Sequence, residues 1–252
     1  MNLRALLKRL VRKTGFDVIR FNARSSPVAR RIRLFAHHGI NLVLDVGANT
    51  GGYALELRRT GYRGRIVSFE PLSSAFARLE ARAARDPQWE AVHAGLGREP
   101  GRQRLHVAQN SESSSLLEML PRHVAAYPKA AYVGTEEVII DRLDDVFARY
   151  YRPGENAYLK IDTQGYERHV LEGAQASLKA ITGIQLELSL VPLYEGEPLF
   201  VDLVAYLEER GYVLMSFEPV IEDPSTGQLL QIDSLFFRPS PPREEPAGLW
   251  KP

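Results

Sequence analysis

The stretch that decides the fold is Leu42-Val43-Leu44-Asp45-Val46-Gly47-Ala48-Asn49-Thr50-Gly51-Gly52. Its first five residues are apolar except for Asp45, which is typical of a short strand buried in a parallel sheet. The glycines that follow allow a tight turn and a close approach of the backbone to a ligand. Residues 53–59 then have the composition of a helix. The stretch predicts a strand, a tight turn and a helix of an α/β fold, with a ligand over the turn.

The chemistry of this turn narrows down the ligand. The turn lacks the Lys-Ser/Thr pair of a P-loop, and its spacing, Gly47-x-x-x-Gly51, is not the dinucleotide fingerprint. Asp45 at the strand end disfavours a pyrophosphate. The next predicted strand, residues 65–70, ends in Glu70, where nucleotide-binding α/β folds place an acid that accepts hydrogen bonds from ribose hydroxyls. The two acids favour a cationic nucleoside, S-adenosylmethionine, although a generic strand-to-helix turn explains the glycine spacing alone equally well.

A second stretch, Ala157-Tyr158-Leu159-Lys160-Ile161-Asp162-Thr163-Gln164-Gly165, repeats the pattern of an apolar strand, an acid and a glycine before a predicted helix over 166–172. In open parallel sheets, ligands bind beyond the carboxyl ends of neighbouring strands. If the two strands are neighbours, Asp162 faces the same crevice as Asp45. The alternative is that Asp162 caps the helix that follows it.

The remaining elements extend the same sheet. Helices are expected over residues 75–84 and 200–210, and strands over 89–93, 104–107, 183–188, 211–217 and 232–237, the last two as an antiparallel hairpin at one edge. His93 ends one of these strands and is a candidate adenine contact, but a lone histidine is more often structural. The polar run 111–115 is a connection that is also placed to cover the site.

Composition bounds the class of protein. The 252 residues contain no cysteine, which excludes disulfides and thiolate metal sites. No stretch approaches 18 apolar residues, and residues 1–20 lack the apolar core of a secretion signal, so a cytoplasmic location is expected. The net charge of +1 hides an asymmetry: residues 1–33 hold ten basic residues and one acid, a net of +9, whereas the other 219 residues carry about −8, from 22 basic and 30 acidic residues.

The basic segment has leucines at helical spacing, at positions 3, 6, 7 and 10, with basic residues on much of the remaining surface. Such a helix over residues 1–24 either contacts the inner face of an anionic membrane or packs on the protein's own domain or a second subunit of a homo-oligomer. Nucleic acid is not expected as a partner, because the rest of the chain is acidic. The predicted organisation is a basic segment over 1–33, a domain over 34–240 and a loose tail over 241–252.

Three blocks carry a family resemblance: Asp45 to Gly51, Phe69-Glu70-Pro71, and Lys160 to Glu167. Their order and spacing resemble the FkbM-type S-adenosylmethionine-dependent methyltransferases. The resemblance implies a class I (Rossmann-like) fold, with a mostly parallel seven-stranded sheet, one antiparallel edge strand and helices on both faces. It also implies O-methylation of an acceptor such as a sugar or glycoconjugate.

The resemblance also implies roles for residues in these blocks. The methionine end of the cofactor would be lined by Asp45, Gly47, Ala48, Asn49 and Gly51. Glu70, followed by Pro71, would hold the ribose, and Asp162 would lie near the transferred methyl group. This sequence departs from the pattern at Gln164, where many members have Glu, which weakens any metal or substrate role of that position.

Methylation of an aliphatic hydroxyl needs a group that removes its proton. Asp162 is the first candidate for this base, with Glu187 and His169 as lesser ones, and His169 is equally compatible with a surface position. A divalent metal held by Asp162 and Glu187 is a less favoured alternative. The Asn/Asp-Pro-Pro-Tyr/Phe motif of amino-group methyltransferases does not follow this strand, which favours oxygen as acceptor. Rival functions are a catalytically inactive S-adenosylmethionine-binding or scaffold protein and a dinucleotide oxidoreductase.

Overall fold

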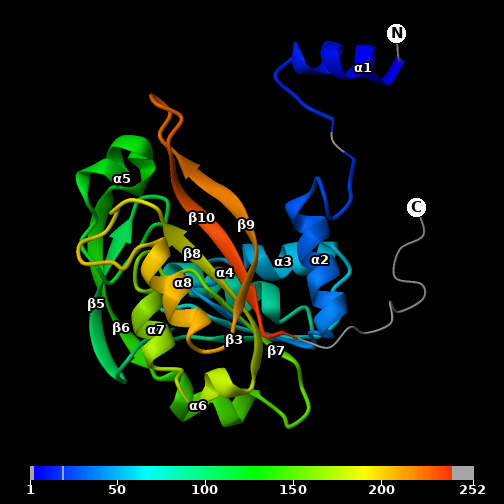
Figure 1. Cartoon of the computed structure of the whole chain (residues 1–252). Coiled ribbons are helices and arrows are strands. Elements are labelled where there is room, and N and C mark those ends of the chain that lie inside the picture. Colours follow the sequence, from blue (N-terminus) through cyan, green and yellow to red (C-terminus); the bar gives the residue numbers. More distant parts are fainter. Residues whose placement is uncertain (1–2, 19, 240–252) are drawn as a thin grey trace. The chain divides into compact units, whose positions relative to one another are not determined.

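The computed structural model describes residues 3–18 and 20–239 (Figure 1). The described residues fall into two compact units, which meet in the sequence between residues 37 and 38. The predicted loose tail over 241–252 lies outside the described residues. In the first unit, α1 (Leu3–Arg12) confirms the predicted basic helix, and α2 (Pro27–His38), which was not predicted, follows it.

The second unit is built on a seven-stranded sheet in the order β3-β2-β1-β7-β8-β10-β9. Its strands are β1 (Leu42–Val46), β2 (Arg65–Phe69), β3 (Trp89–Val92), β7 (Ala157–Ile161), β8 (Ile181–Ser189), β9 (Val213–Glu222) and β10 (Leu229–Phe237). Five strands are mutually parallel, and β10 runs antiparallel to both of its neighbours, β8 and the edge strand β9. The mostly parallel fold and the antiparallel hairpin at one edge are therefore confirmed.

Register brings the two sequence blocks together. β1 lies between β2 and β7, so Asp45 is directly opposite Ser68 on one side and Lys160 on the other. All five residues of β1 and all five of β7 are buried. Helices cover the sheet on both faces, which explains why the two strands are apolar except for Asp45 and Lys160.

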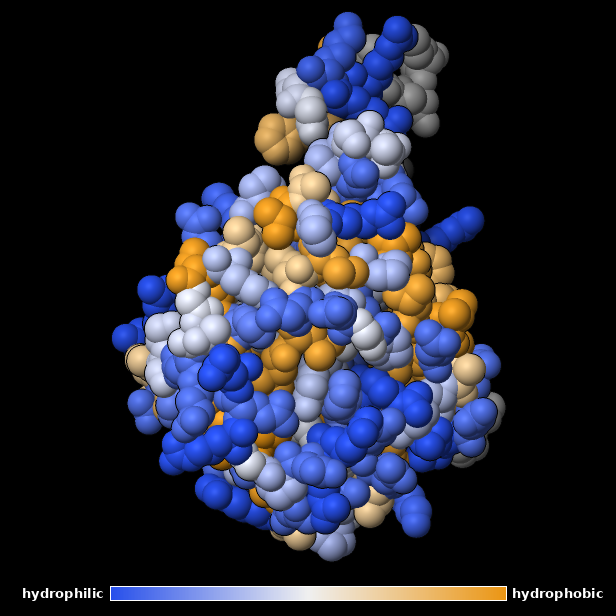
Figure 2. Space-filling view, turned by 90° about the vertical axis from the view of Figure 1, so that its left-hand side faces the viewer, coloured by the Kyte–Doolittle hydropathy of each residue, from blue (hydrophilic) through white to orange (hydrophobic). Residues whose placement is uncertain are grey.

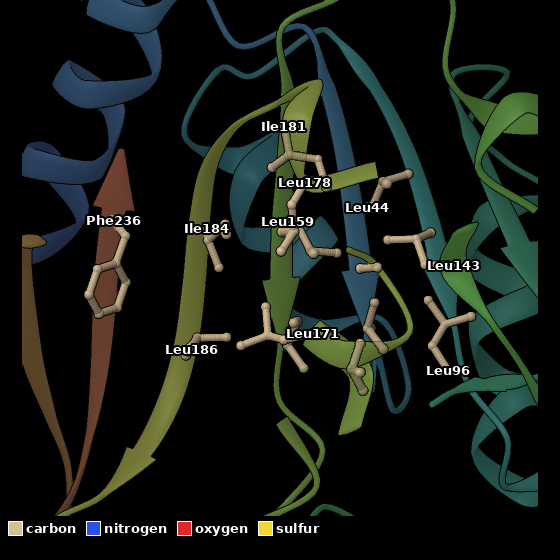
Figure 3. Close-up of a cluster of buried hydrophobic side chains, with 14 of the residues drawn as sticks. Leu44, Leu96, Leu143, Leu159, Leu171, Leu178, Ile181, Ile184, Leu186 and Phe236 are labelled. Atoms are coloured by element: carbon tan, nitrogen blue, oxygen red, sulfur yellow. The ribbon is translucent and has the colours of Figure 1, made fainter. Parts of the chain in front are cut away.

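Six helices of this unit lie between its strands along the chain. Their bounds are α3 (Gly52–Arg59), α4 (Ser73–Ala83), α5 (Pro121–Ala126), α6 (Leu143–Tyr150), α7 (Glu167–Glu172) and α8 (Phe200–Glu208). α6, α7 and α8 cover one face, where their apolar side chains pack on leucines and isoleucines of β1, β7 and β8 (Figures 1 and 3). α3 and α4 lie behind the sheet in Figure 1.

A second sheet stands beside the first. It has three strands in the order β4-β6-β5, namely β4 (Gly95–Leu96), β5 (Gly101–Ala108) and β6 (Tyr132–Asp141). The sequence predicted part of β5 but not β6, because Gly134 and two glutamates interrupt the alternation of β6. Leu105, Val138 and Ile140 pack on the start of α4 and fasten this sheet to the unit.

The outer surface is mixed. Figure 2 shows the side on which Figure 1 draws α5, β5 and β6, and hydrophobic side chains form separate patches there among hydrophilic ones. None of the helices in the described ranges combines the length and the hydropathy needed to traverse a bilayer.

Candidate active site

A pocket lies beyond the carboxyl ends of β1, β2 and β7, which are neighbours in the sheet. It is lined by Val46, Gly47, Asn49, Glu70, Pro71, Gly95, Leu96, Leu105, Ser111, Glu112, Ser114, Leu116, Ile140, Asp162, Thr163 and Tyr166. Three of these described residues are acids, Glu70, Glu112 and Asp162, and none is Lys, Arg or His. The wall therefore favours a ligand with positive charge and apolar surface.

Gly47 is required by the closeness of two strand ends. Its φ of 75° is left-handed, and a Cβ there would lie 1.8 Å from the carbonyl oxygen of Asp162. Its N–H and that of Ala48 both donate to the carbonyl of Phe69 at 3.0 Å. The loop after β1 is thus held between β2 and β7, and only glycine fits at its first position.

Glu70 fastens the same loop from the pocket wall. Its Oε2 accepts the N–H of Asn49 at 2.7 Å, and its Oε1 accepts the N–H of Leu72 at 2.8 Å. Burial raises the pKa of Glu70 to about 7, against the effect of these two donors. The carboxylate has lone pairs left for ligand hydroxyls, as expected of a ribose contact.

Asp45 lies beneath the pocket and is not part of its wall. Its side chain is fully buried, accepts the Ser68 hydroxyl at 3.1 Å, and has Lys160 Nζ 3.4 Å from its Oδ1. Burial raises the pKa of Asp45, and the ammonium of Lys160 opposes that rise. The first acid of the sequence pattern therefore acts as the counter-ion of a buried lysine.

Lys160 was not singled out from the sequence, yet it joins the two acids. Its ammonium lies 3.2 Å from Asp162 Oδ2 and 3.4 Å from Oδ1 of Asp45, its partner residue across β1 and β7. Burial lowers the pKa of Lys160, but Asp162, Asp45 and Asp233 together raise it above its ordinary value. The lysine therefore stays charged and holds Asp162 in place.

Asp162 reaches the pocket, with 31% of its side chain exposed. Besides Lys160, its partner is Gln164, whose Nε2 donates to Oδ1 at 2.9 Å. None of the hydrogen bonds described for Asp162 goes to the backbone of α7, so the alternative that it caps this helix is wrong. The geometry presents a fixed carboxylate to the pocket.

Comparison with known proteins agrees with this geometry. The sequence model of the methyltransferase FkbM domain matches residues 45–214, which is more than half of the chain. The chain belongs to the FkbM methyltransferase family. The match covers all three blocks on which the resemblance was based.

Individual relatives of this FkbM methyltransferase are distant. It is 30% identical over 178 residues to the AMB antimetabolite synthetase AmbE of Pseudomonas aeruginosa, a match that covers 58% of this chain and 8% of that protein. The crystal structure of a methyltransferase FkbM from Methylobacillus flagellatus matches with 16% identity and a TM-score of 0.48, over 79% of this chain and 43% of that one. A precorrin-6y C5,15-methyltransferase from Geobacter metallireducens matches with 12% identity and a TM-score of 0.43, over 83% and 87%. The chain thus spans less than half the length of the first two relatives.

Glu187 of the FkbM methyltransferase lies behind the pocket. Gln164 separates it from the wall: the amide Nε2 donates to Glu187 Oε2 at 2.5 Å, while Tyr194 donates to the amide Oε1 at 2.6 Å. Burial, together with the negative charges of Asp162 and Asp233, raises the pKa of Glu187 well above its ordinary value. An acid that is buried and protonates easily is a poor base for a substrate it does not touch.

The residues do not fit a metal between Asp162 and Glu187. The Gln164 amide already bridges the two carboxylates as a hydrogen-bond donor, and among the residues that the structure describes no group of three or more His, Cys, Asp or Glu side chains is arranged to hold an ion.

The other predicted site residues lie away from the wall. His93 is exposed and stacks on Phe76 at 4.3 Å. His169 stacks on the lining residue Tyr166 at 4.0 Å, and burial lowers its pKa. Ala48 is buried, and a Cβ on Gly51 would lie 2.7 Å from the Trp89 ring, so this glycine serves packing.

Backbone strain is concentrated at the pocket. Over the described ranges, three non-glycine residues have positive φ: Asn49 at 47°, Ser111 at 60° and Gln164 at 56°. Asn49 Nδ2 donates to Ser111 Oγ at 3.0 Å, and Ser115 Oγ donates to the Gln164 carbonyl at 2.6 Å. The polar run 111–115 thus joins the loops after β1 and β7, and strained residues of this kind persist where the surroundings fix them.

Proposed function

We propose that this protein transfers the methyl group of S-adenosylmethionine to a hydroxyl oxygen of a sugar or glycoconjugate. The observation that carries the proposal is the pocket itself. It meets the carboxyl ends of three parallel strands, and its described lining has three acids and no basic residue. A sulfonium and an ammonium group are favoured in such a field, whereas the phosphates of a dinucleotide are not.

The residues present fit the nucleoside. Glu70 offers lone pairs for the ribose hydroxyls, and leucine and isoleucine side chains of the small sheet offer an apolar wall for a base. When bound, S-adenosylmethionine supplies an electrophilic methyl group for in-line displacement. The contribution of the protein to that step is mainly the position of the acceptor.

Asp162 is the proposed base. It reaches the pocket, and Lys160 and Gln164 fix both of its oxygens, so its carboxylate is held toward the acceptor side. It accepts the proton of the acceptor hydroxyl as the oxygen attacks, a role that contributes typically 10²- to 10⁴-fold. The strand end reads Asp162-Thr163-Gln164-Gly165 without the proline pair of amino-group methyltransferases, which supports oxygen as acceptor.

The test begins with calorimetry of the purified chain with S-adenosylhomocysteine and with NAD. Binding of the first and not the second is expected, and the reverse result would exclude the proposal. Transfer of a labelled methyl group is then measured over a panel of sugars and glycoconjugates. Binding without transfer to any hydroxyl acceptor would favour the inactive binding protein.

A further inference from the structure

The N-terminal unit carries side chains that the candidate active site does not use. On α1, Leu7 and Leu10 are 59% and 53% exposed, and after it Phe16 and Val18 are 73% and 51% exposed. Leu7 and Leu10 are one helical turn apart and so lie on the same side of α1. This short segment therefore presents four large apolar side chains to water.

Positive charge surrounds these apolar residues. Lys8, Arg9 and Lys13 are exposed beside them. The single acid among residues 1–33, Asp17, is paired with Arg12 at 2.9 Å. The pair cancels that negative charge within the segment, so residues 7–18 offer a surplus of positive charge.

We infer that residues 3–18 dock on the surface of an anionic phospholipid bilayer. Such a surface offers negative headgroups for the basic side chains and, a few ångströms deeper, an apolar layer for the leucines and Phe16. The ten residues of α1 span about 15 Å, half of the hydrocarbon thickness, so the helix lies along the surface. This inference goes beyond the proposed methyl transfer and does not rest on it.

The observations favour lipid over other occupants. A nucleic acid provides phosphates but no apolar layer for Leu7, Leu10 and Phe16. A second copy of this chain provides apolar surface, but it brings a second segment with a net charge of +9 against the first, and like charges repel. An anionic bilayer satisfies both features of the segment at once.

The test is cosedimentation of the full chain with vesicles of phosphatidylcholine alone and with vesicles that contain phosphatidylglycerol. Binding to the anionic vesicles is expected, with loss when salt is raised from about 0.1 M to about 1 M, because the Debye length falls from about 10 Å to about 3 Å. The triple variant Lys8→Gln/Arg9→Gln/Lys13→Gln should bind about a hundred-fold more weakly, at about five-fold for each basic residue. Leu7→Glu/Leu10→Glu should abolish binding.

Matched controls carry the same changes elsewhere. Arg85→Gln/Lys129→Gln/Lys179→Gln removes the same three charges from exposed positions of the second unit, and Val133→Glu/Val201→Glu adds two acids at positions that are each 67% exposed. Both controls should bind vesicles within two- to three-fold of the unchanged chain. All variants should bind S-adenosylhomocysteine equally, which separates this test from that of the proposed function.

Several results would overturn the inference. Equal binding to neutral and anionic vesicles, or equal loss in the controls, would show that the segment is not the docking surface. Absence of vesicle binding would also overturn it. If the chain then sediments as a dimer that Leu7→Glu/Leu10→Glu dissociates, the segment is an interface between copies.

Discussion

The strand ends of β1 and β7 look alike in the sequence and differ in the structure. Each has an apolar strand, an acid and then a glycine with positive φ. Asp45 is fully buried under the pocket, whereas Asp162 reaches into it, and Lys160 lies between the two. One acid therefore supports the lysine that contacts the other, and only Asp162 of the two is accessible from the pocket.

The largest effect is expected from a substitution of Asp162. Asp162→Asn removes the proposed base while keeping its size and its bond to Gln164. Turnover should fall about 10²- to 10⁴-fold, with the affinity for S-adenosylhomocysteine within a few fold. Methyl transfer and calorimetry measure the two quantities. Glu112→Gln, another acid of the pocket wall, is the matched control and should lose less than about five-fold; near-normal turnover of Asp162→Asn would remove its catalytic role.

Gly47 after β1 and Gly165 after β7 should differ in how much stability a substitution by alanine costs. At Gly47 an added Cβ meets the carbonyl oxygen of Asp162 at 1.8 Å, but at Gly165 it meets the Tyr194 side chain at 3.0 Å. Gly47→Ala should therefore cost about 4 kcal/mol or more of unfolding free energy, and Gly165→Ala about 1–3 kcal/mol. Urea denaturation at neutral pH gives both values. Equal losses of unfolding free energy in the two variants would show that the closer approach of the backbone at Gly47 does not matter for stability.

The ion pair between Asp45 and Lys160 can be tested by a double-mutant cycle. Lys160→Met leaves Asp45 buried without its counter-ion and should cost about 3 kcal/mol, whereas adding Asp45→Asn should recover about 1 kcal/mol or more of that loss. Urea unfolding of the two single variants and the double variant yields the coupling. Strict additivity would show that Asp45 and Lys160 do not depend on one another.

The two loops are fastened alike, each by a buried glutamate. Glu70 accepts the N–H of Asn49, and Glu167 accepts those of Thr163 and Gly165. Burial raises the pKa of Glu70 to about 7 and that of Glu167 to about 8. Above the ordinary value of 4.5 the folded chain then binds more protons than the unfolded one, so stability should fall as pH rises from about 4.5 to about 8.

This slope is measured by urea unfolding between pH 5 and pH 8. Glu70→Gln and Glu167→Gln should each flatten it, by about 3 kcal/mol and about 4 kcal/mol over the window. A variant with Glu112→Gln, whose side chain is exposed, should keep the full slope. An unchanged slope in Glu70→Gln would indicate that this carboxyl does not titrate in the folded chain as inferred.

The parts of the fold that the sequence predicted are those that depend on neighbours along the chain. The strand of Leu42 to Val46, its glycine turn and the following helix are visible because a buried strand is a continuous apolar run. β6 escaped prediction because Gly134, Glu136 and Glu137 interrupt its apolar residues on both faces of the strand. The alternation of apolar residues along a strand indicates which face is buried, but it does not indicate that the strand belongs to a second sheet.

The sequence predicted which acids gather at the site, but not which of them line the pocket and which lie buried beneath it. Glu70 and Asp162 each follow the last residue of a strand and line the pocket, whereas Asp45 lies one residue inside the end of β1 and does not. The orientation of Asp45 depends on its pairing with Lys160 across β1 and β7, which no local pattern contains. Lys160 itself was missed, because a lysine in an apolar strand is usually read as solvent-facing, and one of its two partners, Asp45, is distant in sequence.

The amide of Gln164 also determines how many negative charges meet at this site. It is the neutral link between two carboxylates, and it satisfies them with a single nitrogen. Exchange of that nitrogen for an oxygen, as in Gln164→Glu, would place three acids next to one another, two of them buried, and they would have to share protons or recruit a cation. The exchange of this one side chain therefore decides whether a neutral donor or a third acid lies between the two carboxylates.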